Sequence, residues 1–95
     1  MKIKSNYIFY QNYANVYELL KTFPEIRNAL IITKFRNEQL YQLENGDMWR
    51  IKKIKSIDSI TGLYWDKAYV EYAVVQTFPE IIEYIKDKHL NYKIF

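Results

Sequence analysis

The chain has 95 residues, of which 49% are apolar and 26% are charged, and its formal net charge is +3. This length predicts one domain over residues 1–95, and the balance of apolar and charged residues excludes the class of disordered proteins. The absence of cysteine excludes disulfides, thiolate metal sites and cysteine nucleophiles.

The first predicted element is a strand over residues 2–10. Its apolar residues occupy both sides of a period-2 pattern, which is typical of a strand buried on both faces. Asn12 can then cap a helix that runs to about Lys21. This helix has one apolar stripe with spacing i, i+3, i+4 and i+7, formed by Tyr13, Val16, Tyr17 and Leu20.

The pentapeptide Thr-Phe-Pro-Glu-Ile occurs twice, at residues 22–26 and 77–81. A Thr followed three residues later by Glu is typical of a capping box, in which each side chain binds the backbone amide of the other residue. Proline in the first turn removes an amide that has no intrahelical partner. We interpret both copies as helix starts and not as a duplication, because the sequences around them diverge.

Residues 29–35 are β-branched and apolar enough to form a central strand. A hairpin is predicted next, because Asn45-Gly46 separates residues 40–44 from residues 47–51. Both central positions of a two-residue type I′ turn favour this dipeptide.

A two-residue turn would pair Tyr41 with Arg50 and Leu40 with Ile51. One face of the ribbon would then point to the core, and it carries Leu40, Trp49 and Ile51. The opposite face would be amphipathic, and it carries Tyr41, Leu43, Met48, Arg50 and Lys52.

The rest of the chain predicts an irregular segment, a strand, a helix and a short tail strand. Residues 56–66 lack periodicity, and Gly62 indicates a turn. Alternation over residues 67–76 predicts a half-buried strand. The second pentapeptide starts a helix with Phe78, Ile81, Ile82 and Ile85 inward, and residues 92–95 could add an edge strand.

These elements predict an α+β fold: a mainly antiparallel sheet of four to six strands with two helices packed on one face. The other face of the sheet would be open to solvent or to a partner. Exposed Tyr and Trp beside Arg are the usual anchors of protein interfaces, although such rings also fill the cores of domains with few leucines. The candidate binding residues are Tyr41, Arg50, Lys52, Tyr64, Trp65 and Tyr69.

One cluster of basic residues offers an alternative. Cations that follow a phosphate backbone, together with rings that stack on bases, hold single-stranded nucleic acid on a sheet surface. The residues concerned are Trp49, Arg50, Lys52, Lys53 and Lys55. Alternation splits these cations between two faces, so we favour a solvated edge strand whose lysines oppose aggregation as the explanation of the cluster.

The sequence predicts neither catalysis nor a cofactor. The single histidine, His89, follows an amphipathic helix, where an imidazole can interact with the last carbonyls. No phosphate loop or dinucleotide fingerprint is present. The acidic residues that a metal site could use, Asp47, Asp58, Asp66 and Glu71, show no recognised ligand spacing, so we expect no metal.

In composition the chain resembles small accessory proteins of viruses and mobile elements with A/T-rich genomes, because Ile, Lys, Asn, Tyr and Phe are abundant. The resemblance implies a homodimer or a protein that binds host or viral partners. No signal peptide and no apolar run of about 18 residues is found, so we expect a cytoplasmic protein. The first hypothesis is therefore a non-enzymatic binding protein, and the second is a nucleic-acid-binding module.

Overall fold

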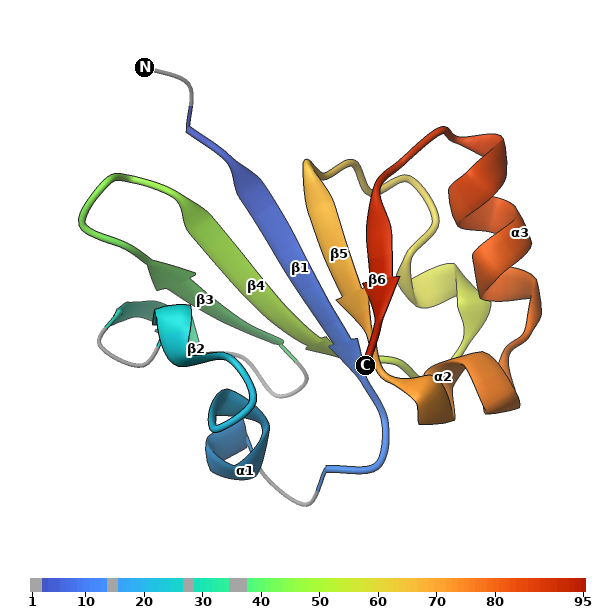
Figure 1. Cartoon of the computed structure of the whole chain (residues 1–95), viewed down its shortest axis with the longest axis horizontal. Coiled ribbons are helices and arrows are strands. Elements are labelled where there is room, and N and C mark those ends of the chain that lie inside the picture. Colours follow the sequence, from blue (N-terminus) through green and yellow to red (C-terminus); the bar gives the residue numbers. More distant parts are fainter. Residues whose placement is uncertain (1–2, 14–15, 27–28, 35–37) are drawn as a thin grey trace.

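A computed structural model describes residues 3–13, 16–26, 29–34 and 38–95. Six strands form one sheet in the order β2-β3-β4-β1-β5-β6 (Figure 1). The strands are β1 (Ser5–Tyr10), β2 (Leu30–Lys34), β3 (Glu38–Gln42), β4 (Met48–Lys53), β5 (Lys67–Val70) and β6 (Tyr92–Ile94). The helices are α1 (Val16–Leu20), α2 (Tyr72–Thr77) and α3 (Glu80–Asp87), with 3-10 turns η1 (Pro24–Ile26) and η2 (Ile57–Ser59).

The α+β class is confirmed, but the prediction of a mainly antiparallel sheet is wrong. The sheet is mixed: β1 runs parallel to β4 and to β5, and β5 runs parallel to β6. The antiparallel pairs are β2 with β3 and β3 with β4. Parallel pairing joins segments that are distant in sequence, and local patterns do not record it.

Strand β1 lies at the centre of the sheet. Residues 7–10 are all buried, which confirms the prediction of a strand covered on both faces. Carboxylates bind the backbone before the strand begins. Asp47 Oδ1 accepts a hydrogen bond from the Lys4 amide at 3.0 Å, and Asp66 Oδ2 accepts one from the Ser5 amide at 2.7 Å.

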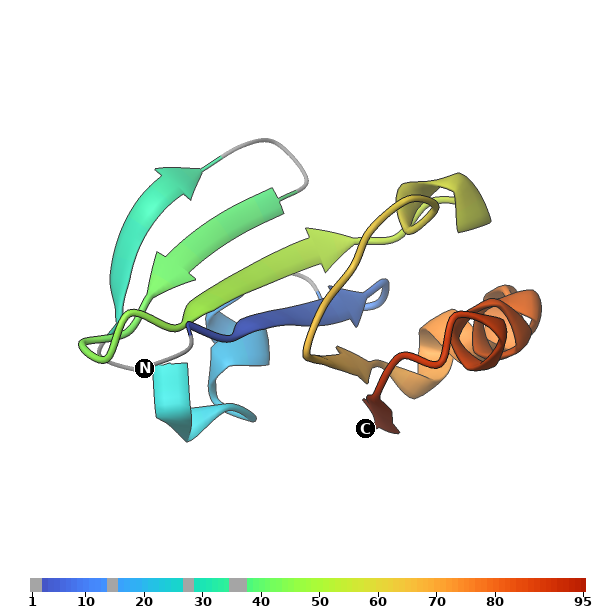
Figure 2. The same cartoon turned by 90° about the horizontal axis from the view of Figure 1, so that it is seen from above.

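Helices cover both faces of the sheet, so the prediction that two helices pack on one face is wrong (Figure 2). Face 1 packs under α1 and η1, and its buried residues are Ile8, Tyr10, Leu19, Phe23, Ile26, Tyr41, Trp49 and Ile51. Face 2 packs under α2, α3 and the segment around η2. Its buried residues are Tyr7, Phe9, Ile54, Ile60, Trp65, Ala68, Val70, Val74, Ile81 and Ile85.

The hairpin between β3 and β4 forms where it is predicted, but its loop is longer. The Gly46 amide donates to the Leu43 carbonyl at 3.0 Å, and the Leu43 amide donates to the Asp47 carbonyl at 2.9 Å. Gly46 has a φ of 94°, in the left-handed region. These features define a three-residue loop that ends in a left-handed glycine; loops of this length usually contain a type I turn.

The longer loop shifts the pairing by one residue, so that Tyr41 lies opposite Trp49 and Leu40 lies opposite Arg50. Such a slip turns every side chain of one strand to the other face. Trp49 and Ile51 are buried on face 1 as predicted, but Tyr41 joins them there and is 3% exposed. Leu40 lies on face 2 instead of in the core.

Two further strands differ from the prediction. The strand predicted over residues 67–76 ends at Val70, and α2 begins at Tyr72. The Tyr- and Val-rich run favours a strand by propensity, but here the chain leaves the sheet for the crossover to β6. β2 is an edge strand and not a central one. Phe35, its predicted end, and the side chains of Val16 and Tyr17 lie outside the described residues.

Both copies of the repeated pentapeptide contain the start of a helical segment, as predicted, since η1 begins at Pro24 and α3 begins at Glu80. The capping box is wrong for the second copy. No side-chain hydrogen bond caps α3. Thr77 is the last residue of α2, so it does not occupy the cap position of α3. Its hydroxyl instead donates to Gln11 Oε1 at 2.8 Å. The predicted tail strand is confirmed as β6.

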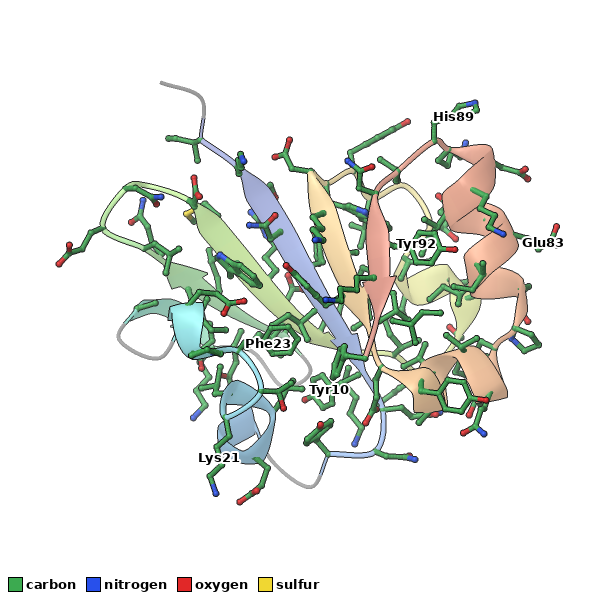
Figure 3. The ribbon with its side chains drawn as sticks, viewed as in Figure 1. Tyr10, Lys21, Phe23, Glu83, His89 and Tyr92 are labelled. Carbon is green, nitrogen blue, oxygen red and sulfur yellow. The ribbon has the colours of Figure 1, made fainter. Side chains whose placement is uncertain are left out.

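Helix α3 ends in a backbone motif centred on His89, which Figure 3 shows at the tip of the helix, pointing away from the sheet. The His89 amide donates to the Lys86 carbonyl, and the Leu90 amide donates to the Ile85 carbonyl, at 3.0 and 3.2 Å. This pair of bonds is the Schellman motif, whose central residue is usually glycine. His89 has a φ of 56°, which is unfavourable for a residue with a Cβ atom.

Replacement of His89 by Gly is expected to raise the free energy of unfolding by about 0.5–1 kcal/mol, because glycine adopts this backbone conformation without strain. Urea denaturation at pH 7 measures the difference. Lys86→Gly is the control, since it places glycine inside the same helix and should destabilise the protein by about 0.5–1 kcal/mol. A destabilised His89→Gly variant would mean that the imidazole itself stabilises the helix end.

Candidate functional site

The helices leave part of face 2 uncovered. Figure 2 shows α1 and η1 on one side of β3 and β4, with α2 and α3 gathered beside β5 and β6. On the uncovered side, β3 and β4 present six side chains, all of them half-buried. We call this set the open face: Glu38, Leu40, Gln42, Met48, Arg50 and Lys52.

Two apolar residues of the open face, Leu40 and Met48, are half-buried. Among the residues whose side chains the structure describes, neither is grouped with the core under α1 or with the core under α3. Arg50 and Lys52 flank them on β4, and Glu38 flanks them on β3. Apolar side chains surrounded by charged ones are typical of a surface that another molecule covers.

Arg50 is held in place by three neighbours. Its guanidinium carbon lies 5.9 Å from the centre of the Tyr7 ring. Its Nη1 donates to Ser5 Oγ at 3.2 Å, and its Nε lies 4.0 Å from Glu38 Oε1. A guanidinium that is already fixed loses less conformational entropy when it binds a carboxylate, so Arg50 is well suited to anchor a partner.

Burial perturbs two phenols of the central strand. Burial raises the pKa of Tyr7, the nearby Arg50 guanidinium lowers it by a smaller amount, and Glu38 raises it slightly. Burial alone raises the pKa of Tyr10. The folded protein therefore favours the neutral form of both phenols.

Stability is expected to fall as the pH rises above about 10, where tyrosines of the unfolded chain lose their protons first. The contribution of Tyr7 and Tyr10 is complete below that pH and disappears as the pH passes through their folded-state pKa values. A Tyr7→Phe, Tyr10→Phe double variant should lose less stability between pH 8 and pH 11 than the unchanged chain. Chemical denaturation at each pH measures this, with exposed Tyr64→Phe as the control. Equal losses in all three proteins would contradict it.

The other predicted binding residues do not join the open face. Tyr41 and Trp65 are buried, at 3% and 7% exposure, so a partner cannot reach them without unfolding. Trp65 packs edge-on against Phe9, with ring centres 5.2 Å apart. Tyr64 is 73% exposed, in the loop before β5, and Tyr69 is half-buried on face 1. Arg50 and Lys52 are the predicted residues that the open face contains.

The residues of the nucleic-acid alternative are also separated. Trp49 is 5% exposed and stacks on Tyr69, with ring centres 5.6 Å apart, so it is not free to stack on a base. Lys53 alternates to face 1, opposite Tyr10 in the register. Lys55 is exposed beyond the end of β4. Two cations of the cluster, Arg50 and Lys52, share the open face.

Face 1 carries a cluster of rings under η1. Phe23 lies over the sheet in Figure 3, and its ring centre is 5.0 Å from that of Tyr69. The Trp49 indole nitrogen is buried there without a hydrogen-bond partner among the described residues. Beside the cluster is a depression of about 560 Å³ whose lining includes Tyr69, Asp47 and Asp66. Asp47 binds the Lys4 amide just before β1, and Asp66 binds the Ser5 amide at its first residue, so both carboxylates contribute to the fold.

Within the part of the chain that the structure describes, no three His, Cys, Asp or Glu side chains are close enough to hold a metal ion. Asp47 and Asp66 line the same depression, whereas Glu71 binds backbone amides at the opposite end of β1 from Asp66. No helix in the described ranges has the length and apolar character needed to cross a membrane.

Sequence reasoning missed Glu38, Leu40 and Gln42 as surface residues. The signal that could have found them is the hairpin loop. Asn-Gly is compatible with a two-residue type I′ turn and also with a three-residue loop that ends in a left-handed glycine, and the second loop places these residues on the open face. Comparisons with protein-family models, with curated proteins and with solved structures found no match to this chain.

Proposed function

We propose that this chain is a non-enzymatic interaction protein that binds a protein partner through the open face, and that its first partner is a second copy of itself. The observation that carries the proposal is a surface with two half-buried apolar side chains, Leu40 and Met48, beside the fixed guanidinium of Arg50. Within the described part of the chain, these two side chains are grouped with neither core. Burial of such apolar groups provides affinity, and a fixed cation provides orientation.

Self-association is consistent with the charges of this surface. Arg50 and Glu38 lie side by side on neighbouring strands. A two-fold axis over the open face would therefore bring Arg50 of each copy close to Glu38 of the other copy. The pair within one chain is long, at 4.0 Å, and both side chains are about one-third exposed, so each retains capacity for another partner.

The solution mass tests the proposal. We expect twice the 11.6 kDa mass of one chain by light scattering at micromolar concentration. Leu40→Asp should give the monomer mass, because it places a charge within the interface. Ile94→Asp is the matched control, since Ile94 is 40% exposed on the edge strand β6. If Ile94→Asp separates the copies and Leu40→Asp does not, the interface lies elsewhere and the open face has no such role.

A monomeric chain would direct the search to another partner. Pull-down from host lysate then compares the unchanged chain with Leu40→Asp, with and without nuclease. A protein captured by the first and not by the second supports binding through the open face. Capture that nuclease abolishes, and that falls steeply with salt, favours the alternative of nucleic-acid binding through Arg50, Lys52, Lys53 and Lys55.

We extend the proposal to the setting of the protein: a small accessory protein of a virus or mobile element that acts in the cytoplasm of its host. What supports this is composition, with ten tyrosines among 95 residues and no cysteine. The proposal includes no cofactor and no catalytic residue.

A further inference from the structure

At the boundary between β1 and β5, the connections that follow the strands change from one face of the sheet to the other. β1 and β5 are adjacent and parallel. After β1 the chain passes to face 1, where Leu19 of α1 is buried, and after β5 it passes to face 2, where Val74 of α2 is buried. In open sheets with parallel strands, ligands bind in the crevice at the carboxyl ends of two such strands.

In this protein a carboxylate of the chain occupies that position. Glu71, the residue after β5, accepts two hydrogen bonds at Oε1: from the Gln11 amide at 2.7 Å and from the Asn12 amide at 2.9 Å. Both amides directly follow β1. Two backbone amides that converge on one oxygen are a general device for binding anions. The Thr77 hydroxyl also donates to the Gln11 side chain, at Oε1, over 2.8 Å.

We propose that the amides of Gln11 and Asn12 form a carboxylate-binding site, and that Glu71 is its resident ligand. The carboxylate links the residues that follow β1 to the residue that follows β5. A free carboxylate binds there when the Glu71 side chain is removed, whereas in the unchanged protein Glu71 already accepts the hydrogen bonds of both amides.

Chemical rescue tests this site. Glu71→Ala removes a CH2COO⁻ fragment, and acetate has the same carboxylate and one more hydrogen on carbon. The variant should melt on the order of 10 °C below the unchanged chain, since it loses two charge-assisted bonds. Sodium acetate should then raise its melting temperature more than sodium chloride does at equal ionic strength. For a dissociation constant of about 0.1 M, 0.5 M acetate should add about 5 °C.

The unchanged chain and Glu44→Ala are the controls. Glu44 is an exposed residue of the hairpin loop, so removal of its carboxylate leaves no gap for acetate. Both proteins should respond to acetate and chloride alike. If acetate stabilises Glu71→Ala no more than chloride does, or stabilises all three proteins equally, the site does not bind carboxylate.

A second variant covers the case in which Glu71→Ala does not fold. Glu71→Gln keeps an oxygen acceptor but removes the charge. The amide protons of Gln11 and Asn12 should then move upfield in the NMR spectrum, because hydrogen bonds to a neutral acceptor are weaker. Unchanged shifts at both amides would overturn the proposal. Neither experiment depends on the open face or on a partner, so its failure leaves the proposed function intact.

Discussion

Reversal of the charge of Arg50 is expected to weaken self-association at least about 30-fold, the factor that corresponds to roughly 2 kcal/mol at a hot-spot residue. In Arg50→Glu a carboxylate takes the place of the guanidinium that Tyr7, Ser5 and Glu38 now hold. It would face Glu38 of the same chain and Glu38 of the second copy. Sedimentation equilibrium over a range of concentrations measures the dissociation constant.

Lys93→Glu is the matched control for this prediction. It makes the same change in net charge, from a positive to a negative side chain, on an exposed residue of β6. Two strands, β1 and β5, separate β6 from β4. Its dissociation constant should stay within about 3-fold of the unchanged value, because exposed charges are screened by salt. Equal weakening by both variants would show that overall charge controls association, and that Arg50 is no anchor.

The two tryptophans are expected to respond differently to replacement by phenylalanine. Trp65 Nε1 donates to the Asn91 carbonyl at 2.8 Å, whereas Trp49 Nε1 is buried without a partner among the described residues. Loss of a satisfied bond removes about 1 kcal/mol, while an unsatisfied buried donor costs about 1–3 kcal/mol. Trp65→Phe should therefore lower the free energy of unfolding by about 2–4 kcal/mol more than Trp49→Phe does.

Equilibrium unfolding in urea measures both variants against the unchanged chain. The ring packing is similar at the two sites, since each tryptophan is over nine-tenths buried and contacts two or more rings. Trp→Ala at each site provides the control for packing, and the two losses should agree within about 1 kcal/mol. Equal losses in the two Trp→Phe variants would mean that Trp49 Nε1 has an acceptor in solution, such as a bound water.

Elements whose signal is local were predictable from the sequence. The unbroken apolar run of β1 indicated a strand covered on both faces, and all of residues 7–10 are buried. The helical spacing of Ile81 and Ile85 indicated the inward side of α3, and both are fully buried. Each of these patterns depends on one segment and its own periodicity.

Features that depend on one residue of register or on distant pairing were not predictable. Asn45-Gly46 favours two loops that differ by one residue, and the difference decides whether Tyr41 or Leu40 reaches the core. The sequence patterns of β4 and β5 do not show that these strands pair in parallel with β1. The open face was therefore predicted on the correct strand, with Arg50 and Lys52, but with the wrong residues opposite them.

The central place of β1 has a consequence for synthesis on the ribosome. The Ser5 amide meets its carboxylate partner, Asp66, 61 positions later. At about 5–20 residues per second, the ribosome needs roughly 3–12 s to make that stretch. Of the two strands that pair with β1, β4 is synthesised within this interval and β5 begins only after it, at Lys67. The apolar β1 is therefore made well before both of its neighbours, so we expect the rate of translation or a chaperone to affect the yield of folded protein.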